Sequence, residues 1–206
     1  MVVNQKTNIA KSKFHYCLTI LCICTLTACD LFTTREPELP TGSSVGGRQF
    51  PRDPQTVVDN LIDAVGRRSS VDYMNTFSSD GTDSATFEYI PDPESVRNFP
   101  GRFDGWDLKQ ELRFSSALFA TSTLPLDSLV NLEIDIDRET VIGDSARTSA
   151  QYDLHIGHLR EGAPRQMSGK MEIELVKGND GGWTVCKWID VRLAGSSCLS
   201  DLKAHF

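Results

Sequence analysis

Positive charge is scarce in this sequence relative to negative charge. The chain has 21 Lys and Arg residues against 28 Asp and Glu residues, a formal net charge of −7. Three of the basic residues, Lys6, Lys11 and Lys13, lie in the first 28 residues, which contain no acid, so 18 basic and 28 acidic residues remain. Binding to nucleic-acid phosphates depends on clustered Lys and Arg. The sequence therefore predicts no nucleic-acid partner.

The sequence also lacks the common motifs of metal, phosphate and nucleophile sites. It has no HExxH motif, no Ser in a nucleophile elbow, and no CxxC motif after position 28. The paired glycines Gly46-Gly47 and Gly181-Gly182 have neither the spacing nor the strand-to-helix context of a phosphate loop. We therefore expect no metal and no cofactor.

An apolar run near the amino terminus is too short to cross a bilayer. It covers residues 14–28, about 15 residues, whereas a transmembrane helix needs roughly 20. Lysines precede the run and small residues end it, which is the order of regions in a secretory signal peptide. The final residues, Leu26-Thr27-Ala28-Cys29, resemble the lipobox of bacterial lipoproteins.

The lipobox resemblance implies cleavage before Cys29 and a diacylglycerol on its thiol. Two or more acyl chains hold a protein stably on a membrane, so the mature chain is expected to be exported and lipid-anchored in a bacterial cell envelope. An uncleaved anchor helix with an incidental Cys is the alternative. Asp30 resembles the inner-membrane retention signal of enteric lipoproteins, a rule that other bacteria do not follow, so the choice between inner and outer membrane stays open.

The chain is expected to have four segments. These are the signal peptide over 1–28, the lipidated Cys and a flexible linker over 29–52, a folded domain over 53–193, and a C-terminal tail over 194–206. Four prolines and three glycines lie between positions 30 and 54, and this stretch has no apolar periodicity, as is typical of a linker.

Helical periodicity dominates the first half of the domain. The pair Asp53-Pro54 is typical of a helix start and is followed by apolar residues at helical spacing. Second and third helices are expected over 71–77, capped by Ser70, and over 106–120, capped by Asp104. The residues expected to face inward from these two helices are Val71, Met74 and Phe77, and Leu108, Leu112 and Phe119. Residues 86–90 are predicted to form a short strand, and residues 91–105 a loop.

The second half of the domain changes to a two-residue period. Apolar and polar residues alternate over 130–137, 150–156 and 167–175, and a fourth strand is expected over 183–193. Helices followed by meandering strands predict an α+β fold, with a curved antiparallel sheet wrapped over about three helices.

The last predicted strand carries a family resemblance. Trp183, Trp188 and Asp190 match the pattern Gly-Trp-x-Ile-x-x-Trp-x-Asp, with Val185 at the Ile position. Together with the order of elements, this strand resembles the nuclear transport factor 2-like superfamily, also called SnoaL-like or cystatin-like. The resemblance implies a cone-shaped half-barrel, a pocket between helices and sheet, and homodimers formed through the sheet. Such domains include isomerases, dehydratases, cyclases and many non-enzymes.

Asp190 and His155 are the two candidate catalytic residues. An inward-facing Asp190 would be desolvated and suited to act as a base, with Tyr73, Tyr89 and Trp188 as candidate pocket residues. The alternative, which we favour, is that Asp190 pairs with a basic residue at the sheet edge and that Trp188 fills the core.

The histidines give little support for a reactive centre. His155 falls on the polar side of its strand and is expected to face solvent. His158, three residues later, is expected on the opposite face, so a shared metal site is not predicted.

Cys186 and Cys198 are the only cysteines after Cys29. An even pair in an exported protein is a candidate disulfide. The alternative is two free thiols, and sequence spacing does not decide between them.

Three functions are consistent with this sequence. The leading one is a lipid-anchored lipoprotein with a non-catalytic binding or interaction domain. The second is a SnoaL-like enzyme acting on a small apolar substrate, with Asp190 or His155 in a deep pocket. The third is a structural component of an envelope complex, contacting another membrane protein through residues 195–206. The helical spacing of Leu199, Leu202 and Phe206 also fits docking of this tail on its own sheet.

Overall fold

The computed structural model describes residues 48–79 and 85–206. The predicted signal peptide, Cys29 and nearly all of the linker lie outside these residues. The elements, in chain order, are α2 (Pro54–Gly66), α3 (Ser70–Met74), β1 (Glu88–Ile90), α4 (Pro93–Asn98), α5 (Leu108–Leu118), β2 (Val130–Ile142), β3 (Ser145–Ile156), β4 (Gln166–Lys177), β5 (Trp183–Arg192) and α6 (Leu199–Ala204).

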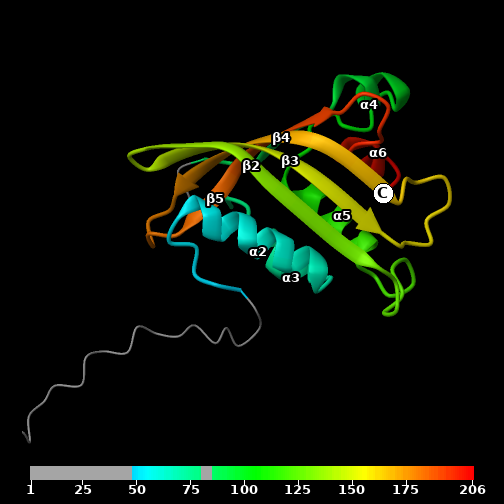
Figure 1. Ribbon diagram of the computed structural model, residues 1–206, viewed down its shortest axis with the longest axis horizontal. Coiled ribbons are helices and arrows are strands. Elements are labelled where there is room, and N and C mark those ends of the chain that lie inside the picture. Colours follow the sequence, from blue (N-terminus) through cyan, green and yellow to red (C-terminus); the bar gives the residue numbers. More distant parts are fainter. Residues whose placement is uncertain (1–47, 80–84) are drawn as a thin grey trace, which may run out of the picture. The chain divides into compact units, whose positions relative to one another are not determined.

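One five-stranded sheet organises the domain, with strand order β1-β5-β4-β3-β2. The strands β2 to β5 form the predicted antiparallel meander, whereas β1 pairs with β5 in parallel, so the sheet is mixed. Figure 1 shows the curved sheet with α2, α3 and α5 on one face, and α4 and α6 beside each other at one end. The predicted α+β architecture is confirmed.

The first helix begins where the sequence predicts. Asp53 is the N-cap of α2, and its Oδ1 accepts a hydrogen bond of 2.7 Å from the backbone N–H of Thr56. Pro54 occupies the first turn, where its missing N–H costs nothing. The helix buries Val57, Val58 and Leu61 against the sheet.

The next two helices begin at other caps than expected. Ser69 caps α3 and Asp107 caps α5. Of the residues predicted to face inward, Phe77 and Phe119 belong to the core, and Met74 and Leu108 pack against it. Val71 and Leu112, both expected inside, are 70% and 48% exposed. Apolar spacing over so few turns does not fix the facing direction of a helix, and packing against the sheet decides it.

The predicted loop over 91–105 contains a helix, α4. Asp92 caps it by accepting hydrogen bonds from the backbone N–H groups of Glu94 and Ser95, at 3.0 and 3.2 Å. The Asp-Pro start is the same device as in α2, but within this six-residue helix only Ser95 is buried. It therefore has no apolar stripe for a sequence pattern to detect.

A register shift decides which residues of β5 face the helices. The pairing of β4 with β5 slips between Glu174 and Leu175. As a result Val185 shares the buried face with Trp188 and Asp190, whereas Val191 lies on the exposed face. Strict alternation groups Val185 with Val191 instead, because it takes no account of a bulge.

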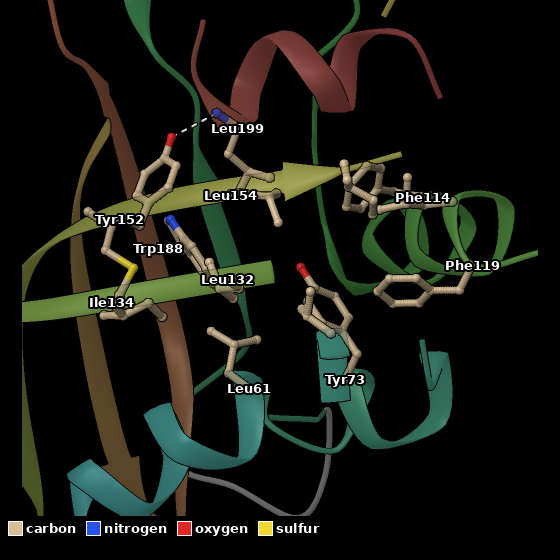
Figure 2. Close-up of a pocket in the computed structure, with 14 residues that line it drawn as sticks. Leu61, Tyr73, Phe114, Phe119, Leu132, Ile134, Tyr152, Leu154, Trp188 and Leu199 are labelled. Carbon is tan, nitrogen blue, oxygen red and sulfur yellow. Dashed lines mark hydrogen bonds between the residues drawn. The ribbon is translucent and has the colours of Figure 1, made fainter. Parts of the chain in front are cut away.

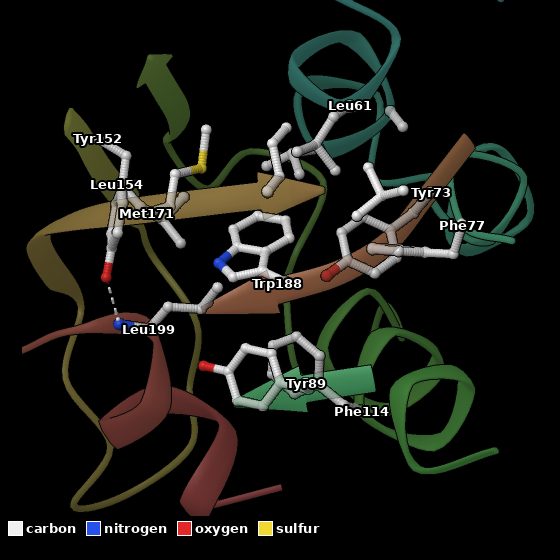
Figure 3. Packing of buried hydrophobic residues seen from close by; sticks show 14 of the residues in the cluster. Leu61, Tyr73, Phe77, Tyr89, Phe114, Tyr152, Leu154, Met171, Trp188 and Leu199 are labelled. Atoms are coloured by element: carbon white, nitrogen blue, oxygen red, sulfur yellow. Dashed lines mark hydrogen bonds between the residues drawn. The ribbon is translucent and has the colours of Figure 1, made fainter. Parts of the chain in front are cut away.

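Residues 194–206, which the sequence predicts to be a C-terminal tail outside the domain, contain α6. Its Leu199 and Leu202 belong to the hydrophobic core, together with aromatic residues from the helices and β5 (Figure 3). The alternative in which residues 199–206 dock on their own domain is the one observed. Within residues 48–79 and 85–206, no helix is long and apolar enough to cross a membrane.

Candidate functional site

An apolar cavity lies between the helices and the inner face of the sheet (Figure 2). It has a volume of about 30 Å³. One buried water needs roughly 10–15 Å³, so this volume corresponds to about two waters. Its lining residues come from α2, α3, α5, the sheet and α6: Leu61, Val65, Tyr73, Phe114, Leu118, Phe119, Leu132, Ile134, Tyr152, Leu154, Ile156, Met171, Trp188 and Leu199.

Trp188 lines this cavity and supplies a polar atom without a partner. Its side chain is 4% exposed, and its Nε1–H has no hydrogen-bond partner among the described residues. An orphan buried donor costs free energy that a well-placed acceptor would recover. Trp188 fills the core, as the sequence analysis favours, and Tyr73 lines the same cavity.

Asp190 points into the domain and is 1% exposed. Its Oδ1 accepts a hydrogen bond of 2.7 Å from the Tyr152 hydroxyl. Its Oδ2 accepts from the backbone N–H and the hydroxyl of Ser200, at 2.7 and 2.6 Å. The favoured expectation of a salt bridge at the sheet edge is therefore wrong, because Asp190 shares the buried face of β5 with Trp188, and hydroxyl and N–H donors there take the place of a cation.

Gly169 on β4 creates the space for the Tyr152 ring. The two residues face each other across the strands, and a Cβ on Gly169 would lie 2.6 Å from Tyr152 Cζ. Real Cβ atoms do not approach so closely, so only glycine lets the ring lie over β4 and reach Asp190. Tyr152 also accepts a hydrogen bond of 2.8 Å from the backbone N–H of Leu199, which ties it to α6.

The tyrosines around Asp190 are held as neutral donors. Burial raises the pKa of Tyr89 and of Tyr152 above the usual range, and the Asp190 carboxylate raises both further. The Tyr89 hydroxyl lies 2.8 Å from Ser200 Oγ. This group of residues is thus a closed hydrogen-bond network, and α6 contributes two of its members.

A second buried cluster joins α6 to α5. Lys203 Nζ lies 2.7 Å from Glu111 Oε2, and both side chains are fully buried. Glu111 also accepts hydrogen bonds from the Tyr73 hydroxyl at 2.6 Å and from Trp106 Nε1 at 2.7 Å. Burial lowers the pKa of Lys203, and the Glu111 carboxylate opposes that shift.

A third contact secures the start of α6. Arg192 Nη2 lies 2.7 Å from Asp201 Oδ1, which also accepts a hydrogen bond of 2.7 Å from the Ser95 hydroxyl. Burial acts to raise the pKa of Asp201, but its hydrogen bonds prevail and lower it. Arg192 Nε is also 3.3 Å from Asp92 Oδ1. Sheet, α4 and α6 are therefore joined by one ionic network.

His155 and His158 do not meet in a site. His155 is exposed on β3, as expected. His158 is fully buried, with its Nε2 2.9 Å from the carbonyl of Pro164 and its Nδ1 accepting from the N–H of Arg160 at 3.1 Å. No group of three or more His, Cys, Asp or Glu in the described part of the chain is placed to hold a metal ion.

His158 gives a prediction about pH. Burial lowers its pKa below the usual value, so the unfolded chain takes up a proton at a pH where the folded domain does not. The free energy of unfolding should therefore fall as the pH is lowered from about 7 through the normal histidine pKa of about 6.5. Urea denaturation at several pH values measures this, and His158→Gln should reduce the slope. An unchanged slope in that variant, with His155→Gln as the exposed control, would contradict the assignment.

Both cysteines of the domain are free thiols in the structure. The half-buried Cys186 lies on β5, with its Sγ 3.4 Å from the carbonyl oxygen of Glu174. Cys198 is completely buried at the N-cap of α6. Burial raises the pKa of the Cys198 thiol to about 12, so it carries almost no reactive thiolate.

The fold of the domain is similar to that of solved structures. A conserved protein from Planctomyces limnophilus matches with a TM-score of 0.50 and 12% identity, covering 68% of this chain and 92% of that one. The helices, the early strand beside β5 and the antiparallel meander are also the elements that the sequence resemblance implied. The domain has a nuclear transport factor 2-like fold. At such low identity, the likeness concerns the fold alone.

Two further solved structures match with lower TM-scores. A superfamily protein from Salmonella enterica serovar Typhimurium matches with a TM-score of 0.46 and 11% identity over 67% of this chain and 87% of its own. A ketosteroid isomerase-like protein from Erwinia carotovora atroseptica matches with a TM-score of 0.46 and 12% identity over 68% and 93%. No protein-family model and no curated protein matches the sequence.

The fully buried ion pair of Glu111 with Lys203 was not predicted from the sequence. Charged residues are almost never fully buried, so the sequence pattern predicts that Glu111 and Lys203 both lie on the surface. The signal that was available is Phe114, which follows Glu111 by three residues and so lies near the same face of α5. For Lys203, only its position beside Leu199 and Leu202 hints at burial.

Proposed function

We propose that this chain is a lipid-anchored lipoprotein of a bacterial cell envelope whose domain is a non-catalytic binding or interaction module. The anchor rests on the lipobox-like sequence before Cys29. The non-catalytic assignment rests on one observation: the carboxylate of Asp190, the leading candidate base, has both oxygens engaged by Tyr152 and Ser200.

The surroundings of Asp190 support this assignment. A general base must reach the proton that it removes, but α6 supplies donors that already occupy this carboxylate, and the neighbouring cavity has room for about two waters. The other candidate, His155, is exposed on the opposite face of the sheet. The two candidate catalytic residues therefore do not converge on one substrate position.

The exposed face of the sheet is the surface that we propose for self-association or for an envelope protein partner. It carries side chains of both signs, including Glu133, Asp135, Asp153 and Lys170, all of which are exposed. Such a polar face suits a non-obligate interface more than an obligate one, because obligate interfaces are more apolar.

The anchor is tested by Cys29→Ala in the full chain, with Cys24→Ala as the matched control. Cys29→Ala should abolish incorporation of radiolabelled palmitate and leave the signal peptide uncleaved, because lipidation at that thiol precedes cleavage before it. Cys24→Ala should label and process as the unchanged chain does, because Cys24 leaves with the signal. Labelled Cys29→Ala protein would overturn the proposed anchor.

The enzyme or carrier alternative has one observation in its favour, the orphan Nε1–H of Trp188 beside an apolar cavity. Native mass spectrometry of residues 42–206, exported without the lipid site, separates the alternatives. A protein of monomer or dimer mass with no retained molecule supports the interaction module. A discrete small apolar molecule carried with the protein would favour the SnoaL-like alternative, and cross-linking to one envelope protein in intact cells would favour the structural role.

A further inference from the structure

The ammonium group of Lys203 lies inside a cage of aromatic rings. Its Nζ is 3.5 Å from the centroid of the Tyr89 ring. The rings of Trp106, Phe114 and Trp188 have centroids at 5.3, 5.4 and 5.7 Å from the same atom. A cation within about 6 Å of a ring centroid is attracted by the negative ring face, so four rings from three different parts of the chain surround one charge.

The cage also has an anionic wall. Glu111 Oε2 accepts from Lys203 Nζ at 2.7 Å, and the Trp106 N–H and the Tyr73 hydroxyl hold the carboxylate in place. A quaternary ammonium has no N–H to donate to this oxygen, and a guanidinium is planar and wider. Rings plus one fixed carboxylate oxygen therefore fit a primary ammonium at the end of a narrow alkyl chain.

The group that fills this cage comes from α6, a helix of six residues. Helices of this length do not persist alone in water. Docking of α6 is instead held by contacts to other elements, among them Arg192 with Asp201 and the hydrogen bonds from Ser200 to Asp190. Lys203 thus reaches its cage in the way a tethered ligand reaches a binding site.

We propose that the cage of Glu111, Tyr89, Trp106, Phe114 and Trp188 is a binding site for primary alkylammonium groups, and that Lys203 is its internal ligand. This inference goes beyond the proposed function and does not depend on the lipid anchor. The tether gives Lys203 an effective concentration of order millimolar or more, so a free amine of similar intrinsic affinity competes with it only at free concentrations above that value. Any ligand of the unchanged site must also undock α6, which couples binding to release of the C-terminal segment.

The test removes the internal ligand and offers a free one. Lys203→Ala in the full chain deletes the three terminal methylenes and the ammonium, a fragment that n-propylammonium replaces. The thermal unfolding temperature and calorimetric binding are measured with n-propylammonium, with tetramethylammonium, and with 1-propanol as the neutral analogue. Lys170→Ala, which removes an exposed lysine on β4, and the unchanged chain are the matched controls.

The expected result is selective binding to Lys203→Ala. The n-propylammonium ion should bind with one-to-one stoichiometry and a dissociation constant on the order of 1 mM, in keeping with its few heavy atoms, and should raise the unfolding temperature. Binding of 1-propanol or tetramethylammonium should be at least about tenfold weaker. Equal stabilisation by 1-propanol, or equal effects on Lys170→Ala, would overturn the proposal.

If Lys203→Ala does not fold, the same ligands decide the question during refolding. In that case n-propylammonium should restore the folded fraction, read by near-ultraviolet circular dichroism, whereas 1-propanol at the same concentration should not. The Glu111→Gln/Lys203→Ala double variant should lose the preference for the charged ligand, because the anionic wall is gone. Failure of the amine to restore folding, or rescue that persists undiminished in the double variant, would overturn the proposal.

Discussion

Glu111→Gln is expected to lower the free energy of unfolding by about 3–5 kcal/mol, the largest effect that we predict for a single substitution. The change leaves the Lys203 ammonium buried without a counter-charge. It also replaces one acceptor oxygen by an NH₂ group, although the Tyr73 hydroxyl, the Trp106 N–H and the Lys203 ammonium all donate toward this side chain. At least one donor then faces another donor in a fully buried site.

Urea denaturation followed by tryptophan fluorescence measures this loss. The matched control is Glu133→Gln on the exposed face of β2, which should change the free energy of unfolding by no more than about 0.5 kcal/mol. A loss for Glu111→Gln as small as that of the control would mean that Lys203 is neutral or reaches solvent in the folded domain. The buried ion pair would then have to be abandoned.

Asp190→Ala is expected to lower the free energy of unfolding by about 3 kcal/mol. The change leaves the Tyr152 hydroxyl and both donors of Ser200 without an acceptor in the interior. Each hydrogen bond to a buried carboxylate is worth roughly 1.5–3 kcal/mol, and these contributions are not additive. Since Ser200 belongs to α6, we also expect faster hydrogen exchange of the α6 amides in this variant.

Denaturation and hydrogen exchange by mass spectrometry test the two parts of this prediction together. Asp135→Ala on the exposed face of β2 is the control and should leave both quantities near those of the unchanged chain. Loss of stability without faster exchange in α6 would show that Asp190 supports the sheet alone. An unchanged stability would show that Asp190 does not hold Tyr152 and Ser200 as described.

The sequence predicted those elements whose residues carry their own local signal. Asp53-Pro54 marks the start of α2 because cap and proline act within one turn, and the alternation over 130–137 marks β2 because side chains of a strand point to opposite faces. The helix α4 was not predicted, because a helix that buries only one residue shows no apolar periodicity in its sequence. For α3, Val71 was wrongly expected inside because five residues make too short an apolar stripe to be unambiguous.

The sequence predicted several residues of the candidate site but not how they are arranged. Trp188 was expected in the core and is there, and Tyr73 lines the cavity. Asp190 was placed at the sheet edge although it shares its strand face with Trp188, because a buried aspartate needs donors and nothing in the local sequence marks those that it meets. Its partner Ser200 lies ten residues away in a segment interpreted as a tail, and such a contact depends on how distant elements pack.

The sequence by itself determined the class of fold, the order of α2, α3, β1, α5 and the four meander strands, and the expectation of an exported chain lipidated at the Cys29 thiol. These follow from composition, local periodicity and short motifs, which are properties of neighbouring residues. Tertiary structure alone decided that Lys203 meets Glu111 across 92 positions and that α6 closes the interior. A charge is buried only where distant parts of the chain bring a counter-charge and donors to it, and no local pattern encodes that meeting.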